Sequence, residues 1–325
     1  MASTPLRSFE EFRGEWEEIL SVSPANTLFL TPQWQQVWWE TFGEGKAMAG
    51  FFLGSTDEVM GIAPLARSGT TLSFVGNTDT VDYNDFMIAP GYETVFFDTL
   101  LDSMEEQQCS TLNLLSLREN SSTLAYLPEL ARRRGYRVVV EEEDVASGLE
   151  LPSTWDGYLT GLGKKDRHEL RRKFRRLETA ANWRWYGLRG ADEVESRVED
   201  FFNLMRMSNQ EKDKYMTPDR EQFFRHIIQC MAQLGLLRLY FLEIDEKPVA
   251  TSLCFDYASS RLLYNSGYDP EFGYYSVGLL LNALCLQEAI GQGMKYFDFL
   301  RGAEAYKAHL GGQQSMIYQM VVQRS

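Results

Sequence analysis

The stretch from Tyr264 to Gly312 restricts the fold of this chain more than any other part of the sequence. Its centre is an apolar helix expected over Val277–Ile290, which ends at Gly291. A loop rich in Gly, Tyr and Pro precedes this helix over Gly267–Ser276, and a short strand follows it over Tyr296–Phe299. The main-chain N–H groups of such a loop and the positive end of the helix favour an anionic group. The order strand, loop, helix and strand therefore predicts a binding site for an anion.

Three β-like runs lead into that stretch, and turns short enough for antiparallel hairpins separate them. They are Leu236–Ile244, Val249–Tyr257 and Arg261–Ser266. The first half of the chain has the same order, with runs at Ala47–Leu53, Val59–Ala66 and Thr71–Val75, a helix at Glu93–Gln107 and a strand at Leu112–Leu117. This repetition predicts an α+β protein of two similar domains, residues 1–145 and 146–325, with the boundary in Glu143–Gly148. We expect each domain to contain a mixed, mainly antiparallel sheet flanked by helices.

Composition limits the classes of function. The formal net charge of −14 argues against a protein that binds duplex DNA through bulk positive charge. No apolar run reaches the roughly 20 residues of a membrane-spanning helix, and the N-terminus lacks the apolar core of a signal peptide, so we expect a cytoplasmic protein. The four cysteines are far apart in apolar segments, which favours buried free thiols over metal ligands.

A dense polar cluster follows the strand at Tyr296–Phe299. It contains Asp298, Arg301, Glu304, Tyr306, Lys307 and His309. Such a cluster beyond the end of a strand lies where ligands of open α/β sheets usually bind. His309 has no second ligand near it in the sequence, so we expect no metal.

A basic segment begins the second half. Lys164–Arg176 holds eight cations in thirteen residues. An apolar stripe at Leu170, Phe174 and Leu177 predicts a helix with one buried face. The cations then form either a solvated face or a local anion site, for which a sugar diphosphate, a coenzyme A phosphate, a tRNA acceptor stem or lipid headgroups would fit.

The C-terminal sequence LLYNSGYDPEFGYYSVGLLLNALCLQEAIGQGMKYFDFLRGAEAYKAHLG resembles the signature of the BcsL/CelD-type acyltransferases, a tandem GNAT family linked to polysaccharide and cellulose biosynthesis. GKKDRHELRRKFRRLE is similar to the basic helix before their second domain, and DYNDFMI also resembles them. YKAHLGG is similar to the Lys-containing motif of the Fem-type peptidyltransferases, which share the architecture but use aminoacyl-tRNA.

The GNAT resemblance implies that the loop before the apolar helix binds the pyrophosphate of an acyl-CoA co-substrate. The donor site would comprise Tyr268, Gly273, Tyr275, Ser276, Val277 and Gly278. The loop departs from the usual Arg/Gln-x-x-Gly-x-Gly/Ala pattern, because its glycines are differently spaced and it carries the acids Asp269 and Glu271. The first half has no such loop, so the resemblance implies a degenerate donor site and an acceptor cleft there.

Roles for the remaining candidates follow from acyl transfer. Lys307 and Arg301 could stabilise the tetrahedral oxyanion, although Lys307 could also be an ordinary surface lysine. Asp298 or Glu304 could be the base, with Asp298 alternatively paired to Arg301, and Tyr306 could protonate the leaving group. The expected acceptor-binding residues are Asp82, Tyr83, Asp85, Arg171, Arg172 and Arg175.

These observations together predict an acyltransferase that moves an acyl group from a thioester to an amine or hydroxyl. The acceptor would be a sugar, a nucleotide sugar or a cell-envelope precursor. We expect direct attack, because no Cys or Ser lies in a nucleophile elbow. The alternatives are a Fem-like transferase that uses aminoacyl-tRNA and a non-catalytic scaffold of a polysaccharide biosynthesis complex.

Overall fold

A computed structural model describes residues 2–55, 58–179 and 182–324. The chain forms two compact units. The first contains the chain up to Val145 and the segment from Ser315 onward, and the second runs from Ala146 to Gln314. The division therefore lies within the predicted boundary segment. The C-terminal segment differs from the prediction, since the last strand returns to the first unit, where it pairs with a strand of that unit's core.

The first unit contains two sheets with helices packed on them. Its elements are β1 (Ala2–Pro5), α1 (Arg13–Val22), η1 (Leu28–Leu30), α2 (Pro32–Phe42), β2 (Ala47–Met48), β3 (Phe51–Gly54), β4 (Val59–Ala63), β5 (Leu65–Ser68), β6 (Thr71–Phe74), β7 (Met87–Ile88), α3 (Glu93–Glu106), β8 (Thr111–Arg118), α4 (Ser122–Arg133), the start of β9 (Tyr136–Glu150) and most of β15 (Gln313–Arg324). β5 and β6 pair antiparallel, β6 and β8 pair parallel, and β8 pairs antiparallel with β15.

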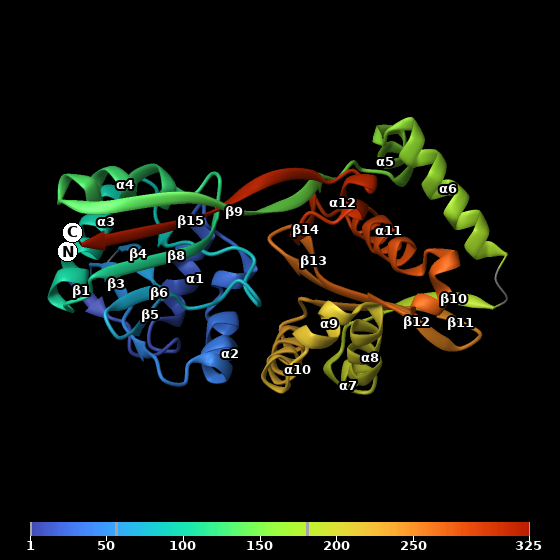
Figure 1. Cartoon of the computed structure of the whole chain (residues 1–325), viewed down its shortest axis with the longest axis horizontal. Helices are drawn as coiled ribbons and strands as arrows, with labels where there is room; N and C mark the ends of the chain where they lie inside the picture. The colour runs from blue at the N-terminus through green and yellow to red at the C-terminus, as the bar shows by residue number, and fades with distance from the viewer. Residues whose placement is uncertain (1, 56–57, 180–181, 325) are drawn as a thin grey trace. The chain divides into compact units, whose positions relative to one another are not determined.

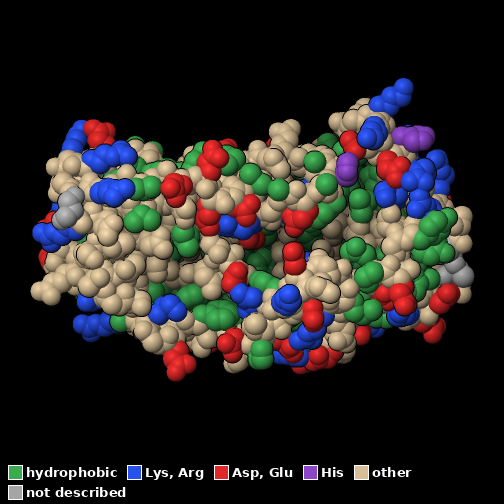
Figure 2. Space-filling model, viewed as in Figure 1, with side chains coloured by type: hydrophobic (Ala, Val, Ile, Leu, Met, Phe, Trp, Pro, Cys, Tyr) green, Lys and Arg blue, Asp and Glu red, His purple; other side chains and the backbone are tan. Residues whose placement is uncertain are grey.

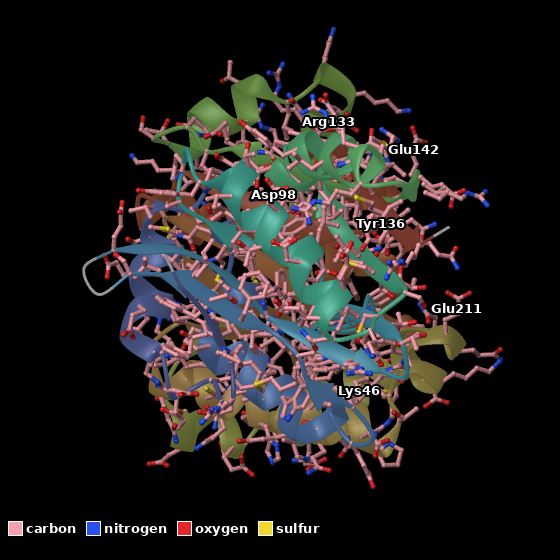
Figure 3. All side chains as sticks on the ribbon, turned by 90° about the vertical axis from the view of Figure 1, so that its left-hand side faces the viewer. Lys46, Asp98, Arg133, Tyr136, Glu142 and Glu211 are labelled. Carbon is pink, nitrogen blue, oxygen red and sulfur yellow. The ribbon has the colours of Figure 1, made fainter. Side chains whose placement is uncertain are left out.

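The three strands predicted for residues 47–75 are five shorter ones. Pro64 separates β4 from β5 because proline has no N–H to donate to the ladder. Gly50 separates β2 from β3, and a Cβ there would lie 2.1 Å from the carbonyl oxygen of Ala63. Arg134, directly after α4, pairs with two carboxylates of α3, Asp98 at 2.7 Å and Asp102. Asp98 is labelled in Figure 3.

The second unit is the one that the stretch Tyr264–Gly312 organises. Its elements are the end of β9, α5 (Trp155–Gly161), α6 (Lys164–Glu178), β10 (Trp183–Leu188), α7 (Ala191–Glu195), α8 (Val198–Ser208), α9 (Gln210–Tyr215), α10 (Pro218–Gln233), β11 (Leu237–Ile244), β12 (Lys247–Tyr257), β13 (Ser260–Tyr268), η2 (Pro270–Tyr275), α11 (Val277–Gly291), β14 (Tyr296–Arg301), α12 (Ala305–His309) and the start of β15. The strand order is β10-β11-β12-β13-β14-β9. Only the β13–β14 pair is parallel in this series.

Helices cover both faces of this sheet. α5, α6 and α11 lie on one face, and α7–α10 lie on the other (Figure 1). α11 is apolar all round, as a helix buried between a sheet and another helix must be, and most of its side chains are buried. No described helix has the length and apolar character needed to cross a membrane.

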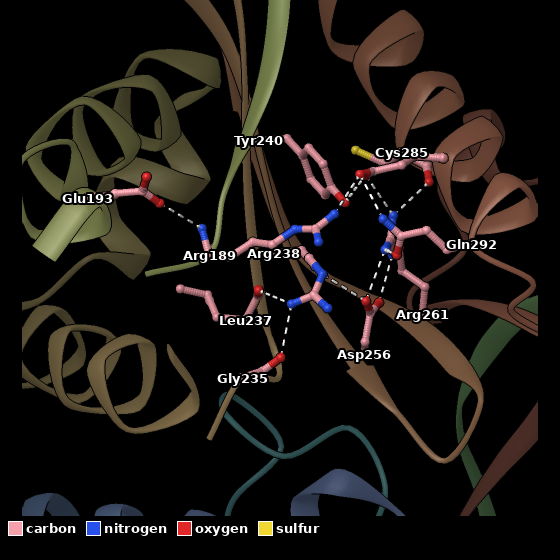
Figure 4. A network of polar contacts seen from close by, with 11 residues as sticks. Arg189, Glu193, Gly235, Leu237, Arg238, Tyr240, Asp256, Arg261, Cys285 and Gln292 are labelled. Atoms are coloured by element: carbon pink, nitrogen blue, oxygen red, sulfur yellow. Dashed lines mark hydrogen bonds and ion pairs between the residues drawn. The ribbon is translucent and has the colours of Figure 1, made fainter. Parts of the chain in front are cut away.

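A buried polar network fixes the C-terminal half of α11 to the hairpins (Figure 4). Arg261 of β13 is fully buried and donates to both carboxylate oxygens of Asp256, at 2.7 and 3.0 Å. It also contacts Glu288 and the carbonyl of Cys285, both on α11 and both at 3.1 Å. This network lies at the opposite end of α11 from the glycine loop.

The strands β13 and β14 pair only where they begin. The register joins Ser260–Leu262 to Tyr296–Asp298, and no later residue of either strand pairs with the other. The ladder between β12 and β13 shifts at Leu253 and Cys254, which face Asn265 and Leu263, so Tyr264 is a bulged residue. Beyond the bulge, no strand of the described residues pairs with the edge of β13 that faces away from β12. This divergence positions the candidate site.

Candidate functional site

The start of α11 presents main-chain donors. The first hydrogen bond into this helix runs from the N–H of Leu280 to the carbonyl of Ser276, at 3.0 Å. The N–H groups of Val277, Gly278 and Leu279 therefore precede the intrahelical ladder, at the positive end of the helix dipole. Ser276 has a φ of 58°, and its hydroxyl does not cap the helix. It accepts instead from the ammonium of Lys173 at 2.8 Å.

Two cations of α6 contact the loop before α11. Besides Lys173, Arg176 donates to the carbonyl of Tyr274 at 2.5 Å, and its guanidinium lies 4.8 Å from the centre of that ring. Both cations lie beside the buried stripe Leu170 and Leu177, so helical spacing turns them toward α11. The predicted substrate-binding cations of this helix were others, Arg171, Arg172 and Arg175.

The selected cations Arg171, Arg172 and Arg175 lie on the exposed side of α6. Arg172 is paired with Glu169, with 2.6 Å between Nη2 and Oε1, and this contact lowers the pKa of Glu169 to about 2. Lys, Arg and His side chains gather on the molecular surface over α5 and α6 (Figure 2). The three arginines predicted to bind an anionic substrate therefore lie on the outer surface of α6. The cations that contact the loop before α11 are Lys173 and Arg176.

Within the predicted loop Gly267–Ser276, residues Pro270–Tyr275 form a 3-10 helix, η2. Asp269 caps η2 by accepting from the N–H of Glu271 at 3.0 Å, and it is fully buried. Lys247 neutralises it across a 2.7 Å ion pair. The negative charge of Asp269 is therefore balanced by Lys247 within the protein.

The other predicted donor residues surround the start of α11. Gly273 is exposed, and Tyr275 is half-buried against the core beneath α11. Tyr268 lies over Gly278, where an added Cβ would approach the Tyr268 ring to 3.1 Å. The six predicted donor residues thus lie on one continuous segment, from the end of β13 through η2 to the first turn of α11.

The open edge of β13 has polar main-chain groups directed away from β12. The N–H of Asp269 donates to the carbonyl of Val249, so the polar main-chain groups of Asp269 point toward β12. Along an antiparallel ladder, residues that point toward the partner strand alternate with residues that point away from it. Tyr268 and Ser266 therefore direct both their N–H and C=O groups outward. Tyr268 confirms the alternation, because its N–H donates to the hydroxyl of Ser208 at 2.8 Å. The N–H of Ser266 points to the side from which β14 has diverged.

The position of Lys307 differs from the prediction of an oxyanion-binding cation or a surface lysine. Its side chain is buried, and its ammonium donates to the carbonyls of Leu300, Arg301 and Gly302 at 3.1, 2.5 and 3.1 Å. It also pairs with Glu304 Oε2 at 2.9 Å. All its N–H donors have partners at the end of β14 and in the turn that follows, so Lys307 fixes this turn.

The neighbouring predicted catalytic residues surround the same turn. Glu304 is 58% exposed and is accessible to a substrate. Burial, reinforced by the charge of Glu304, raises the pKa of Tyr306, so its phenol stays protonated at neutral pH. Asp298 is half-buried and accepts from the N–H of Leu300 at 2.8 Å, and Arg301 is also half-buried. These residues and the donor loop follow the carboxyl ends of the parallel strands β14 and β13, and hence leave the same edge of the sheet.

The structure adds Lys212 of α9, which the sequence analysis did not name. Its ammonium donates to the carbonyl of Ser266 at the open edge of β13. Burial lowers the pKa of Lys212, and the charge of Lys307 lowers it further, while Glu304 raises it. A single lysine in a polar helical segment gives no sequence signal for this position.

In the first unit, the predicted acceptor residues are largely buried. Asp85 is 7% exposed and accepts from the N–H of Phe86 at 2.8 Å and from the hydroxyl of Thr123. Tyr83 is buried beside Phe29, with Arg118 over its ring. Asp82 is half-buried. Their part in acceptor binding stays a prediction.

Among the described residues, no group of three or more His, Cys, Asp or Glu side chains could hold a metal ion. His309 is exposed, and its Nδ1 lies 2.9 Å from Asp166 Oδ1. Cys109, Cys254 and Cys285 are buried free thiols.

Comparisons with known proteins agree with this architecture. Residues 164–308 match the family model of the acetyltransferase (GNAT) domain. The fold is similar to that of FemX, with a TM-score of 0.67 and 12% identity over 98% of this chain and 97% of that one. L-PGS from Bacillus licheniformis gives a TM-score of 0.59 and 12% identity, over 96% of this chain and 91% of that one.

A tandem GNAT protein from the clavulanic acid biosynthesis pathway gives a TM-score of 0.51 and 14% identity, over 98% of this chain and 97% of that one. A comparison with curated protein sequences found no match. The chain thus has the tandem GNAT fold, and its residues 164–308 are similar to the GNAT acetyltransferase domain.

Proposed function

We propose that this protein transfers an acyl group from a coenzyme A thioester to an amine or hydroxyl. The donor's phosphates would bind the N–H groups of Val277, Gly278 and Leu279 together with Lys173 and Arg176. The observation that carries the proposal is the anchoring of both cations on the loop at the start of α11, through Ser276 and the carbonyl of Tyr274. Two fixed cations and a helix N-terminus together match the charge of a pyrophosphate.

The reaction needs no covalent enzyme intermediate. The lone pair of the acceptor nitrogen or oxygen attacks the thioester carbonyl carbon, and the carbonyl π electrons move to oxygen. The oxyanion collapses, the C–S bond breaks, and the thiolate leaves with the bonding pair. The acceptor loses one proton to a base, for which the exposed carboxylate of Glu304 is the candidate. The thiolate takes a proton, and the protonated phenol of Tyr306 can supply it.

The proposed reaction occurs at the open edge of β13. The N–H of Ser266 points to the side from which β14 has diverged, where it can donate to the thioester carbonyl oxygen. The acceptor class proposed is a sugar or cell-envelope precursor. The resemblance of the C-terminal segment to the BcsL/CelD-type acyltransferases supports that class, including a role in polysaccharide or cellulose biosynthesis.

Calorimetric titration with coenzyme A tests the donor site. The double variant Lys173→Gln/Arg176→Gln should weaken binding at least tenfold, because a hydrogen bond to a charged group contributes about 1.5–3 kcal/mol. The matched control Arg171→Gln/Arg175→Gln removes the same charge from the exposed side of α6 and should change the dissociation constant less than threefold. Equal weakening by both variants, or no binding to the wild type, would contradict the proposed donor site.

The exposed cations of α6 favour aminoacyl-tRNA as a second candidate donor. Arg171, Arg172 and Arg175 are exposed, and Lys, Arg and His side chains gather on the surface over α6, where a large anion can approach (Figure 2). For this donor the control variant becomes the informative one. Arg171→Gln/Arg175→Gln should weaken binding of charged tRNA. It should also make the slope of log K against log salt concentration shallower, by roughly 0.7–0.9 for each lost phosphate contact. Binding of tRNA that neither variant affects would exclude α6 as its site.

A further inference from the structure

Lys212 is held at the open edge of β13 by its own helix and by the helix before it. Its N–H caps α9 by donating to Asn209 Oδ1 at 2.8 Å, and its ammonium reaches the carbonyl of Ser266. The side chain is half-buried. The partner of this ammonium is a main-chain carbonyl rather than a carboxylate, so its positive charge is not cancelled by direct pairing.

The junction of α8 and α9 fixes the position of this lysine. Ser208, at the end of α8, receives a hydrogen bond from the N–H of Tyr268 at 2.8 Å. One residue earlier in β13, a Cβ on Gly267 would lie 2.5 Å from the main-chain nitrogen of Met205, so only glycine allows α8 to pack this closely. Lys212 therefore belongs to a segment packed directly on the strand edge.

The ammonium of Lys212 lies on the same side of β13 as the N–H of Ser266. The carbonyl that it contacts and this N–H belong to one residue, and both point outward because Ser266 occupies a non-hydrogen-bonded position of the ladder with β12. A lysine ammonium has three N–H donors, and Ser266 takes one of them. Two donors remain for a ligand beside the outward N–H.

We propose that Lys212 binds the carbonyl oxygen of the transferred acyl group, together with the N–H of Ser266. The assignment rests on the proposed function, and it gives Lys212 the role that the sequence suggested for Lys307. Lys307 cannot fill this role in its observed position, because its ammonium is bonded to three carbonyls and Glu304. When the acceptor attacks, negative charge gathers on the carbonyl oxygen and Lys212 stabilises it. The charge leaves with the thiolate when the C–S bond breaks.

Lysine labelling with a propionylating reagent, read residue by residue by mass spectrometry, tests both assignments in one experiment. The probes are acetyl-CoA and coenzyme A, which share phosphates but differ in the acyl carbonyl. Both probes should protect Lys173 at the donor loop. Acetyl-CoA should protect Lys212 at least threefold more than coenzyme A does. The exposed Lys214 on the same helix should label equally in all samples.

The pattern of protection separates the two proposals. Protection of Lys173 without any difference at Lys212 between the probes would overturn the role of Lys212 and leave the donor site intact. Protection of neither lysine would contradict coenzyme A as the donor, and with it the assignment of Lys212.

Calorimetry of variants gives a second measurement. Wild type should bind acetyl-CoA more tightly than coenzyme A by about tenfold, the effect of one charged hydrogen bond. Lys212→Met should bind the two probes equally, Lys212→Arg should keep part of the preference, and Lys214→Met should behave as wild type. A preference that persists in a folded Lys212→Met variant would overturn the proposal.

Discussion

The ammonium of Lys307 lies 3.1 Å from the carbonyl oxygen of Leu300, in a turn whose backbone is otherwise unfavourable. Leu300 has a φ of 59°, which costs a non-glycine residue about 1–2 kcal/mol. Gly302, two residues on, has a φ of 110°. The ammonium of Lys307 donates hydrogen bonds to the carbonyls of Leu300, Arg301 and Gly302. The turn that carries Glu304 into the site therefore depends on a buried lysine.

Removing this charge should destabilise the protein. Lys307→Met keeps the buried stem but leaves three carbonyls without their donor, so we expect a loss of about 3 kcal/mol in the free energy of urea unfolding. In Lys307→Ala, the vacated space next to three carbonyls and Glu304 should accept a small cation. Added methylammonium should therefore restore part of the lost stability, and tetramethylammonium, which has no N–H donor, should not.

The control for this prediction is Lys295→Met. Lys295 is exposed, so its replacement should change the unfolding free energy by less than about 0.5 kcal/mol. If Lys307→Met unfolds at the same urea concentration as wild type but loses acyl transfer, Lys307 acts on the substrate instead.

The order of elements in the second unit could be predicted from local signals. The helix expected at Val277–Ile290 is α11, Val277–Gly291, because an apolar run that ends in glycines has few alternatives. The three strands before it are β11, β12 and β13, because short turns between β-like runs specify hairpins. These features depend on neighbours in the sequence, which is why the fold was predictable.

The chemistry of the candidate site was less predictable, because it depends on contacts between distant segments. The sequence identifies Lys307 as a conspicuous cation, but only the path of β14 shows that three carbonyls surround it. Lys212 lies more than fifty residues from Ser266, which it contacts. In α6 a local signal did exist, since Lys173 and Arg176 flank the apolar stripe, and closer use of helical spacing would have selected them over Arg171 and Arg175.

The buried network around Arg261 should be the most sensitive polar site of the second unit (Figure 4). Arg261→Met leaves Asp256 and Glu288 without a shared partner in a buried region, and breaking such a pair costs about 3–5 kcal/mol. We expect a loss near the lower value, because Arg238 still pairs with Asp256 at 2.9 Å. Urea unfolding measures this loss.

Arg189→Gln is the matched control within the same network. It removes a cation that also contacts Glu288, at 3.0 Å, but that is 52% exposed. Its loss should stay below about 1 kcal/mol, because exposed ion pairs contribute little. Equal losses in the two variants would show that burial does not set the strength of this network.

Asp85 should make stability depend on pH in the first unit. Burial raises the pKa of its carboxyl group, although hydrogen bonds from Ser121, Thr123 and Phe86 oppose the shift. A folded pKa above the unfolded value of about 3.9 means that folding retains a proton that the unfolded chain releases. The stability of wild type is therefore fully present below that value and falls as the pH rises toward the folded pKa. Asp85→Asn keeps one oxygen that can accept from Phe86 and Thr123, carries no charge and should not show this fall. Urea unfolding between pH 4 and pH 8 should find the variant increasingly stable relative to wild type as the pH rises, by about 1.4 kcal/mol for each pH unit of the pKa shift.

The exposed carboxylate variant Glu106→Gln is the control, and its stability should follow that of wild type at every pH. A constant difference between Asp85→Asn and wild type across this range would mean that Asp85 is ionised in the folded protein throughout, held by its hydrogen bonds.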